Sequence, residues 1–201
     1  RLRDRTDRER LRKDQNMLKT VTGSISAAIM ISIGGSVFLA CDNKYYGAIL
    51  FSVALLSICY LGFYLYTGKI GYVVADHSPN NLALLGIGLV GNLAVTFPVG
   101  MLIRRAMPAL GDAAEQICSK KLEQSFGSTL VRAIFCGVLM YIAVEIFRSK
   151  KSPIGVLFGI PVFILAGFEH SIADMFYFGA SGISSGKIAL FEVAAVLGNS
   201  I

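Results

Sequence analysis

The chain has 201 residues, of which 54% are hydrophobic and 16% are charged, and its formal net charge is +6. A soluble domain of this length usually has about a quarter of its residues charged. Three segments contain no Asp, Glu, Lys or Arg, and each exceeds the roughly 18 apolar residues that argue for a membrane-spanning helix; they are 20–41, 45–68 and 78–103. These features exclude a soluble globular domain and predict an integral membrane protein.

The amino-terminal segment is strongly basic, with 8 of the 19 basic residues in the first 19 positions. Acidic residues alternate with these arginines, which favours a solvated amphipathic helix over a nucleic-acid-binding arm. We therefore expect residues 1–16 to form a basic cytoplasmic helix or tail, and residues 17–201 to form a transmembrane domain. A signal peptide is not expected, because the first uncharged segment is longer than a signal core and no small-residue cleavage site follows it.

The hydrophobic segments predict five spans and part of a sixth. The five spans are 20–40, 47–73, 82–103, 126–147 and 154–178. Residues 104–125 form the longest polar connection, and GASGISSG after the fifth span reads as a flexible loop. The sixth segment begins near Ile188, and its roughly 14 residues of helix would reach about 21 Å, short of a hydrocarbon core about 30 Å thick. We expect the natural chain to continue beyond this segment.

Basic residues also predict the orientation. With the amino terminus inside, the tail and RSKK at 148–151 share the cytoplasmic side, as the positive-inside rule requires. The basic residues of the 104–125 connection then lie outside and count against this assignment. We predict a multi-pass protein of the inner (cytoplasmic) membrane with a cytoplasmic amino terminus.

The fifth span contains Glu169, His170 and Asp174. An acidic residue at the centre of a membrane helix costs about 2.5–3.5 kcal/mol on translocon scales. On a continuous helix Glu169 and His170 would point about 100° apart, so both must face protein, water or a pore. A satisfied packing cluster is the alternative, in which Glu169 accepts from backbone amides or from Arg132.

The second span has a matching feature at LYTG, residues 65–68. Gly68 after a β-branched hydroxyl residue suits a helix interruption, which is tolerated where protein or water satisfies the freed backbone groups. The two interruptions fall in the second span of each half of the chain. Corresponding interruptions of this kind point to a transport site between inverted repeats.

The four cysteines form no CxxC pair and have no partner histidine cluster, so neither a metal nor another cofactor is expected. Nor can a nucleophile–base–orienter set be assembled, which makes an enzyme the least favoured class.

LYTG and GFEHSIADMF resemble the formate/nitrite transporter family, and the resemblance extends from about Leu18 to the end of the chain. It implies an all-α, aquaporin-like inverted-repeat bundle of six helices, the sixth truncated here and the second and fifth interrupted. It further implies a homopentamer with one pore per subunit that passes formate, nitrite, hydrosulfide or similar small anions. LYTGKIGY looks more like the hydrosulfide-type branch than the formate branch.

The resemblance also assigns pore residues. His170 matches the central pore histidine, and Thr67 matches the threonine of the interrupted second helix that can hydrogen-bond it. Leu55, Leu65 and Tyr66 match the inner constriction, and Phe51 and Phe163 match the outer apolar constriction. Lys19 matches a lysine of the inner vestibule, and Lys121 matches a lysine of the outer vestibule. Gly137 and Asp174 depart from the family, since both stand where formate channels have asparagine, and Gly137 puts formate preference in doubt.

A bare anion in an apolar constriction loses its hydration at a cost of order tens of kcal/mol. We therefore expect Lys19 and Lys121 to concentrate anions, Thr67 and His170 to hydrogen-bond them, and the substrate to cross at least partly as the neutral acid. Whether His170 donates a proton or only a hydrogen bond is open at this stage.

Two other functions stay open from the sequence. One is a channel for neutral solutes such as water, glycerol or ammonia, although aquaporin-type NPA pairs are absent from the sequence. The other is a membrane scaffold that uses the charged tail to hold a soluble partner.

Overall fold

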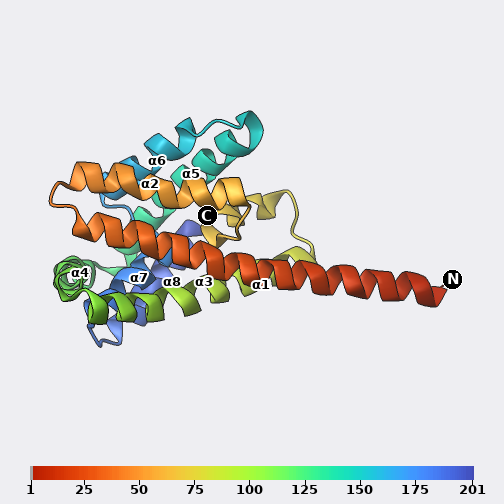
Figure 1. Cartoon of the computed structure of the whole chain (residues 1–201), viewed down its shortest axis with the longest axis horizontal. Coiled ribbons are helices and arrows are strands. Elements are labelled where there is room, and N and C mark those ends of the chain that lie inside the picture. Colours follow the sequence, from red (N-terminus) through yellow and green to blue (C-terminus); the bar gives the residue numbers. More distant parts are fainter. Residues whose placement is uncertain (1) are drawn as a thin grey trace.

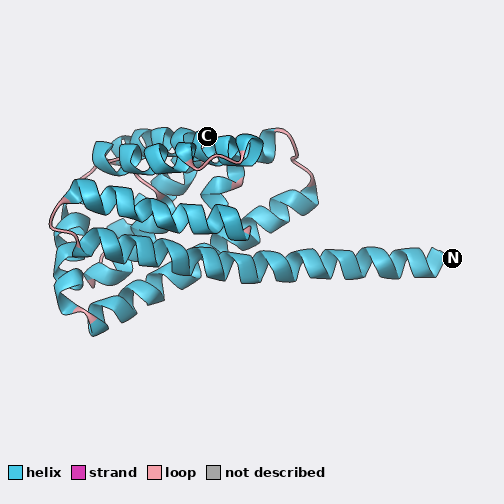
Figure 2. Ribbon diagram, turned by 45° about the horizontal axis from the view of Figure 1, so that its top comes forward, coloured by secondary structure: helices cyan, strands magenta, loops and turns pink. Residues whose placement is uncertain are grey.

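The computed structural model describes the backbone of residues 2–201 and the side chains from Arg10 onward. Over this range the chain is a bundle of α-helices with two short 3₁₀ helices, η1 and η2, after the second helix (Figures 1 and 2). In chain order the elements are α1 (Leu2–Ala40), α2 (Lys44–Leu61), η1 (Tyr66–Gly68), η2 (Ile70–Val74), α3 (Pro79–Ala106), α4 (Pro108–Lys121), α5 (Phe126–Lys150), α6 (Ile154–Ala166), α7 (Ser171–Ser181) and α8 (Lys187–Asn199).

Four described helices, α1, α2, α3 and α5, are long and apolar enough to cross a membrane. The pair α6 and α7 meets the same criterion together and is bent by 54° at a short break, so that it forms a broken fifth span. The chain is therefore a multi-pass membrane protein, as predicted. The break in the fifth span is confirmed too.

The amino-terminal part of α1 projects from the bundle as a single uninterrupted helix (Figure 1). The end of the bundle from which it projects, which we call the inner end, also holds residues 62–78 and the turn between α5 and α6. α4 and the loop between α7 and α8 lie at the opposite, outer end (Figure 1). The predicted boundary between residues 16 and 17 falls inside α1, so the division into tail and membrane domain stays a prediction.

The structure corrects two of the predictions made from the sequence. The polar connection 104–125 contains the helix α4, which starts at Pro108 and buries Leu110, Ala114 and Cys118. These positions are four residues apart and therefore form one buried stripe along the helix. The predicted loop at 179–186 begins later than expected, because α7 continues to Ser181 before Gly182 ends it.

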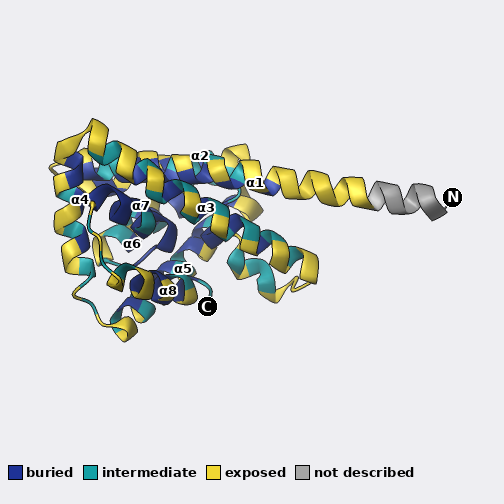
Figure 3. Ribbon diagram, turned by 90° about the horizontal axis from the view of Figure 1, so that it is seen from below, coloured by how far each residue is buried: buried dark blue, intermediate teal, exposed yellow. Residues whose placement is uncertain are grey.

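Many large apolar side chains are exposed on the outside of the bundle, whereas the buried residues include polar side chains as well as an apolar core. Figure 3 shows where the exposed and buried segments lie along the ribbon. Examples of the outward-facing residues are Ile49, Val53, Phe158 and Leu165, each between 46% and 69% exposed. Inside the bundle, Thr67, Asn92, Glu169 and His170 are almost fully buried. An apolar outside with a polar interior is the arrangement that a lipid-embedded transport protein requires.

Candidate functional site

Both helix breaks are built in the same way. Gly62 with φ +68° follows the end of α2, and Gly167 with φ +70° follows the end of α6. Glycine adopts this left-handed conformation without the strain that a Cβ would add. Three residues further on, Leu65 and His170 are extended and precede the next helices, η1 and α7. The two halves of the chain therefore place equivalent turns inside the bundle.

Asn92 of α3 satisfies the backbone groups freed by the first break. Its Oδ1 accepts from the backbone N–H of Tyr66 at 2.9 Å. Its Nδ2 donates to the carbonyl oxygens of Ser24 at 2.9 Å and of Tyr64 at 3.1 Å. A buried amide with every hydrogen bond made fixes the loop relative to α1 and α3.

Asn199 of α8 does the same for the second break. It accepts from the backbone N–H of Ser171 at 2.9 Å, and its Nδ2 donates to the carbonyl oxygens of Ala133 and Glu169, both at 2.9 Å. This set repeats that of Asn92, element for element, with α5 in place of α1 and α8 in place of α3. The internal repeat is thus visible in individual hydrogen bonds.

The sequence placed the first interruption at LYTG, residues 65–68, with Gly68 as its helix-breaking residue, and the structure shows that the break begins earlier in the chain. α2 ends at Leu61, and Gly62 follows it, where the backbone N–H of Phe63 bonds to the carbonyl oxygen of Ile58 at 3.0 Å. Gly68 lies buried at the end of η1, and 3₁₀ turns rather than a second α-helical half continue the chain.

Thr67 and His170 meet in the middle of the bundle. Thr67 Oγ1 lies 2.9 Å from His170 Nε2, and the two residues are 2% and 3% exposed. The other ring nitrogen, Nδ1, accepts from the backbone N–H of Ala173 at 3.2 Å and so caps α7. Since Nδ1 is an acceptor, the neutral ring carries its proton on Nε2 and donates it to Thr67. The hydroxyl hydrogen of Thr67 is then left to donate elsewhere.

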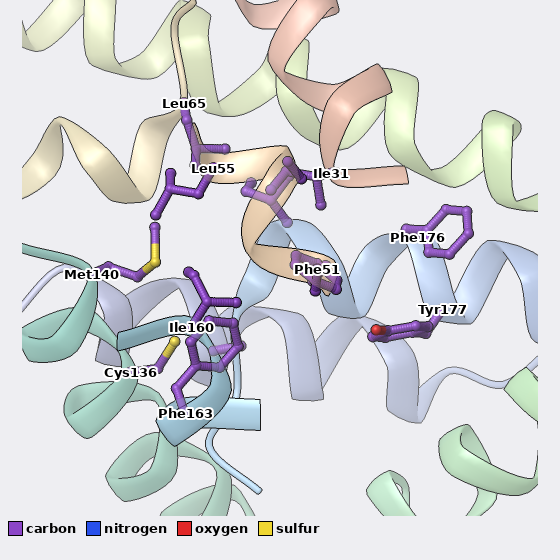
Figure 4. Packing of buried hydrophobic residues seen from close by; sticks show 14 of the residues in the cluster. Ile31, Phe51, Leu55, Leu65, Cys136, Met140, Ile160, Phe163, Phe176 and Tyr177 are labelled. Carbon is purple, nitrogen blue, oxygen red and sulfur yellow. The ribbon is translucent and has the colours of Figure 1, made fainter. Parts of the chain in front are cut away.

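Two cavities lie on either side of this pair. The outer cavity has a volume of about 260 Å³ and is lined by His170 with Phe51 and Phe163. The Phe163 ring is stacked on the imidazole with centroids 5.7 Å apart. The inner cavity has a volume of about 550 Å³ and is lined by Leu55, Leu65 and Gly68, among others. Figure 4 shows Leu55 and Leu65 side by side, with Phe163 on the neighbouring α6.

Lys121 at the end of α4 lines the outer cavity but is paired with acids. Its Nζ bonds to a carboxylate oxygen of Glu169 and lies 2.9 Å from Oδ1 of Asp174. Burial by itself lowers the pKa of Lys121, but the two carboxylates more than offset this, so its pKa lies above the ordinary value. Lys121 is therefore a charged residue that two acids neutralise, and its expected role of concentrating anions in the outer vestibule stays a prediction.

The partner that was suggested for Glu169 is corrected, whereas the pore roles of Tyr66 and Lys19 stay predictions. Glu169 accepts from Lys121 and from Gln124 Nε2 at 2.7 Å, whereas Arg132 bonds to the carbonyl oxygen of Gly167. Tyr66 lines neither of the two described cavities and turns its hydroxyl to Ser200 Oγ at 2.7 Å. Lys19 is exposed on α1 and is not among the described residues that line the inner cavity.

The sequence-based predictions missed several residues of the site. Asn92 and Asn199 hold the breaks, but a single asparagine in an apolar helix gives no sign of its partner. Lys69 and Arg148 line the inner cavity. Lys69 directly follows LYTG in the sequence, so its proximity to the interruption was a usable signal.

Comparison with known proteins identifies the family. The profile of the formate/nitrite transporters matches residues 5–201. The chain belongs to this family. Relatives include the uncharacterized transporters YrhG and YwcJ of Bacillus subtilis (strain 168), and formate-nitrite transporter 2 of Toxoplasma gondii (strain ATCC 50611 / Me49).

Their sequence identities to the chain are low. YrhG is 29% identical over 152 residues (67% of this chain and 56% of that protein). YwcJ is 27% identical over 188 residues (82% and 73%). The Toxoplasma protein is 26% identical over 165 residues (75% and 35%). The chain thus spans little more than half the length of YrhG.

Solved structures show the same fold. A pentameric formate channel with formate bound superposes with a TM-score of 0.67 at 23% identity and covers 92% of each chain. An FNT family ion channel superposes with a TM-score of 0.72 at 18% identity and covers 92% of this chain and 83% of that one. The all-α, aquaporin-like architecture predicted from the sequence is confirmed. Members of the formate/nitrite transporter family with this fold are transporters and channels, not enzymes.

The two departures from formate-channel asparagines have structural accounts. Gly137 of α5 faces the backbone of Asn199, where an added Cβ would lie 2.9 Å from the carbonyl oxygen, so the glycine allows α5 and α8 to approach closely. Asp174 holds Lys121. The place of this chain within the formate/nitrite transporter family, including the hydrosulfide-type branch, stays a prediction.

Proposed function

We propose that the chain passes small monovalent anions of weak acids, of the formate, nitrite or hydrosulfide type, through a pore inside each subunit. The hydrogen bond between Thr67 and His170, placed between two cavities that approach from opposite ends, carries this proposal. The pore would run from the inner cavity past Leu55 and Leu65 to this pair, and then past Phe163 and Phe51 to the outer cavity.

The two pairs of apolar side chains give the pore a high electrostatic barrier. Phe51, Leu55, Leu65 and Phe163 are each no more than 4% exposed. A charged anion that sheds its water among such side chains meets a cost of order tens of kcal/mol, whereas a neutral acid does not. We therefore propose that the substrate crosses the constrictions as the neutral acid and is an anion in the cavities.

The tautomer of His170 defines what the central pair offers the substrate. With its proton on Nε2 and its Nδ1 engaged by Ala173, the imidazole orients Thr67 so that the threonine hydroxyl donates to the substrate. To release its Nε2 proton, the ring would have to gain one at Nδ1, where the N–H of Ala173 already points. The geometry thus supports His170 as a hydrogen-bond donor that orients Thr67, with the substrate's proton coming from the aqueous cavities.

We propose a homopentamer in the inner membrane with a cytoplasmic amino terminus. The pentameric formate channel of the same fold supports the assembly, as do the exposed apolar side chains on the outside of the bundle. The orientation is supported by basic residues, because the basic amino-terminal part of α1 and the 148–151 segment both lie at the inner end.

Flux of formate into liposomes, compared between Thr67→Val and Thr67→Ser, tests the proposal. Valine keeps the shape but removes the hydroxyl, and a lost hydrogen bond to the neutral acid costs about 0.5–1.5 kcal/mol, or roughly 2- to 10-fold in rate. Serine should retain most of the flux. Equal flux in the two variants would remove Thr67 from the mechanism. Glycerol permeation equal to formate flux in the wild type would instead favour a channel for neutral solutes.

A further inference from the structure

The inner cavity is bordered by an excess of positive charge. Its lining includes Lys69 after η1, Arg148 near the end of α5 and Lys151 in the following turn, against a single acid, Asp76. The outer cavity carries less net positive charge, because two acids, Glu169 and Asp174, offset the three cations in its lining, Lys120, Lys121 and Arg132. The two approaches to the Thr67–His170 pair are therefore electrostatically unequal.

The inner cations are held in place by aromatic rings. Lys69 Nζ lies 5.9 Å from the ring centroid of Tyr64, and the Arg148 guanidinium lies 4.7 Å from that of Tyr72. Both tyrosines line the same cavity. The hydroxyl of Tyr72 donates to Glu145 Oε2 at 2.6 Å, which ties the η2 turn to α5. Cation–π contacts leave the polar side of each cation able to bind an anion.

A positive-inside anchor is the simpler explanation for basic residues at this end of the bundle. A positive-inside anchor requires only that the basic residues are exposed beside a span, as Lys150 is. Lys69 and Arg148 meet a stricter condition, because they border a cavity that leads to Leu55, Leu65 and Gly68.

We propose that Lys69, Arg148 and Lys151 form an anion-collecting site in the inner cavity, which draws small monovalent anions toward the Thr67–His170 pair. This inference rests on the proposed function, and it assigns to these residues the concentration of anions that the sequence analysis assigned to Lys19. Two unit charges about 8 Å from a small anion in water-like surroundings raise its local concentration about fivefold at low ionic strength. The enrichment falls as salt shortens the screening length.

Cys59 is a built-in probe of this site. It lines the inner cavity and is partly buried, whereas Cys118 and Cys136 are fully buried. In a Cys41→Ser background, the protein in detergent is treated with an anionic methanethiosulfonate carrying a sulfonate, or with a cationic one carrying a trimethylammonium group. Peptide mass spectrometry gives the two rates of Cys59 modification. Their ratio reports the local potential, because the reactivity of the thiol itself cancels.

The double variant Lys69→Gln with Arg148→Gln should lower the anionic-to-cationic ratio about tenfold in ~10 mM salt, and the difference should vanish near ~1 M salt. Lys150→Gln, which removes a nearby charge outside the cavity lining, should leave the ratio unchanged. An equal ratio in the wild type and the double variant, or an equal loss with Lys150→Gln, would overturn the proposal.

A flux measurement separates this inference from the proposed function. If the wild type conducts formate and the double variant raises the half-saturating formate concentration from the inner side about fivefold, without changing it from the outer side, both proposals are supported. Formate flux in the wild type with unchanged half-saturation on both sides would refute the collecting site alone. Absence of any anion flux in the wild type would refute the proposed function, whatever the labelling ratio shows.

Discussion

Replacing Asn92 by alanine tests whether the first helix break depends on one buried side chain. Asn92 is 0% exposed and forms hydrogen bonds with the N–H of Tyr66 and the carbonyl oxygens of Tyr64 and Ser24. Truncation leaves the N–H of Tyr66 unpaired, which costs about 1–3 kcal/mol, and weakens two carbonyl contacts. A total of about 3 kcal/mol corresponds to a lowering of the melting temperature by roughly 6–12 °C for a chain of this size.

The melting temperature can be measured in detergent with a thiol-reactive fluorophore, because Cys118 and Cys136 are 0% exposed and react only on unfolding. Asn80→Ala, at an exposed position near the start of the same helix, is the matched control and should melt with the wild type. The repeat predicts a loss of similar size for Asn199→Ala. If Asn92→Ala melts within about 2 °C of the wild type, the reasoning about the break is wrong.

The remaining predictions concern the two other polar groups of the site. His170→Asn should fold like the wild type, because asparagine can also cap α7. It should slow formate flux about tenfold, because its shorter side chain does not orient Thr67. His170→Phe should lose formate flux and also about 1 kcal/mol of stability. Unchanged flux and pH dependence in both variants would contradict the role of His170. Lys121→Ala should destabilise the protein by about 3–5 kcal/mol, because it leaves Glu169 and Asp174 without their cationic partner. In the melting assay, Lys120→Ala, at an exposed neighbouring position, should have a melting temperature near that of the wild type. Equal melting temperatures for the two variants would refute the ion-pair argument.

The broken fifth span was predictable because Glu169 and His170 cannot share one face of a continuous membrane helix. The location of the break in the second span was not. Gly62 and Gly68 are both glycines in an apolar run, and the choice between them depends on Asn92, which contacts the loop from a helix later in the chain. Information of that kind lies in tertiary structure and not in local sequence.

The pairing of side chains in the site shows the same limit. The alternative reading gave Glu169 backbone amides or Arg132 as partners, but α4 brings Lys121 to it from outside the predicted spans. The helix α4 itself was overlooked because its short stripe of Leu110, Ala114 and Cys118 lies within a polar connection. Residues such as Phe51 and Phe163 could be placed at the outer cavity only through resemblance, since any apolar residue satisfies the same pattern.

The central claim is that weak acids cross the constrictions beside Thr67 and His170 in neutral form. The most direct test is the flux of formate, nitrite, hydrosulfide, lactate and chloride into liposomes at two external pH values. The account predicts that formate flux rises as pH falls, that chloride, whose acid stays ionised, hardly passes, and that Thr67→Val lowers formate flux at both pH values. Chloride flux equal to formate flux at both pH values would contradict it.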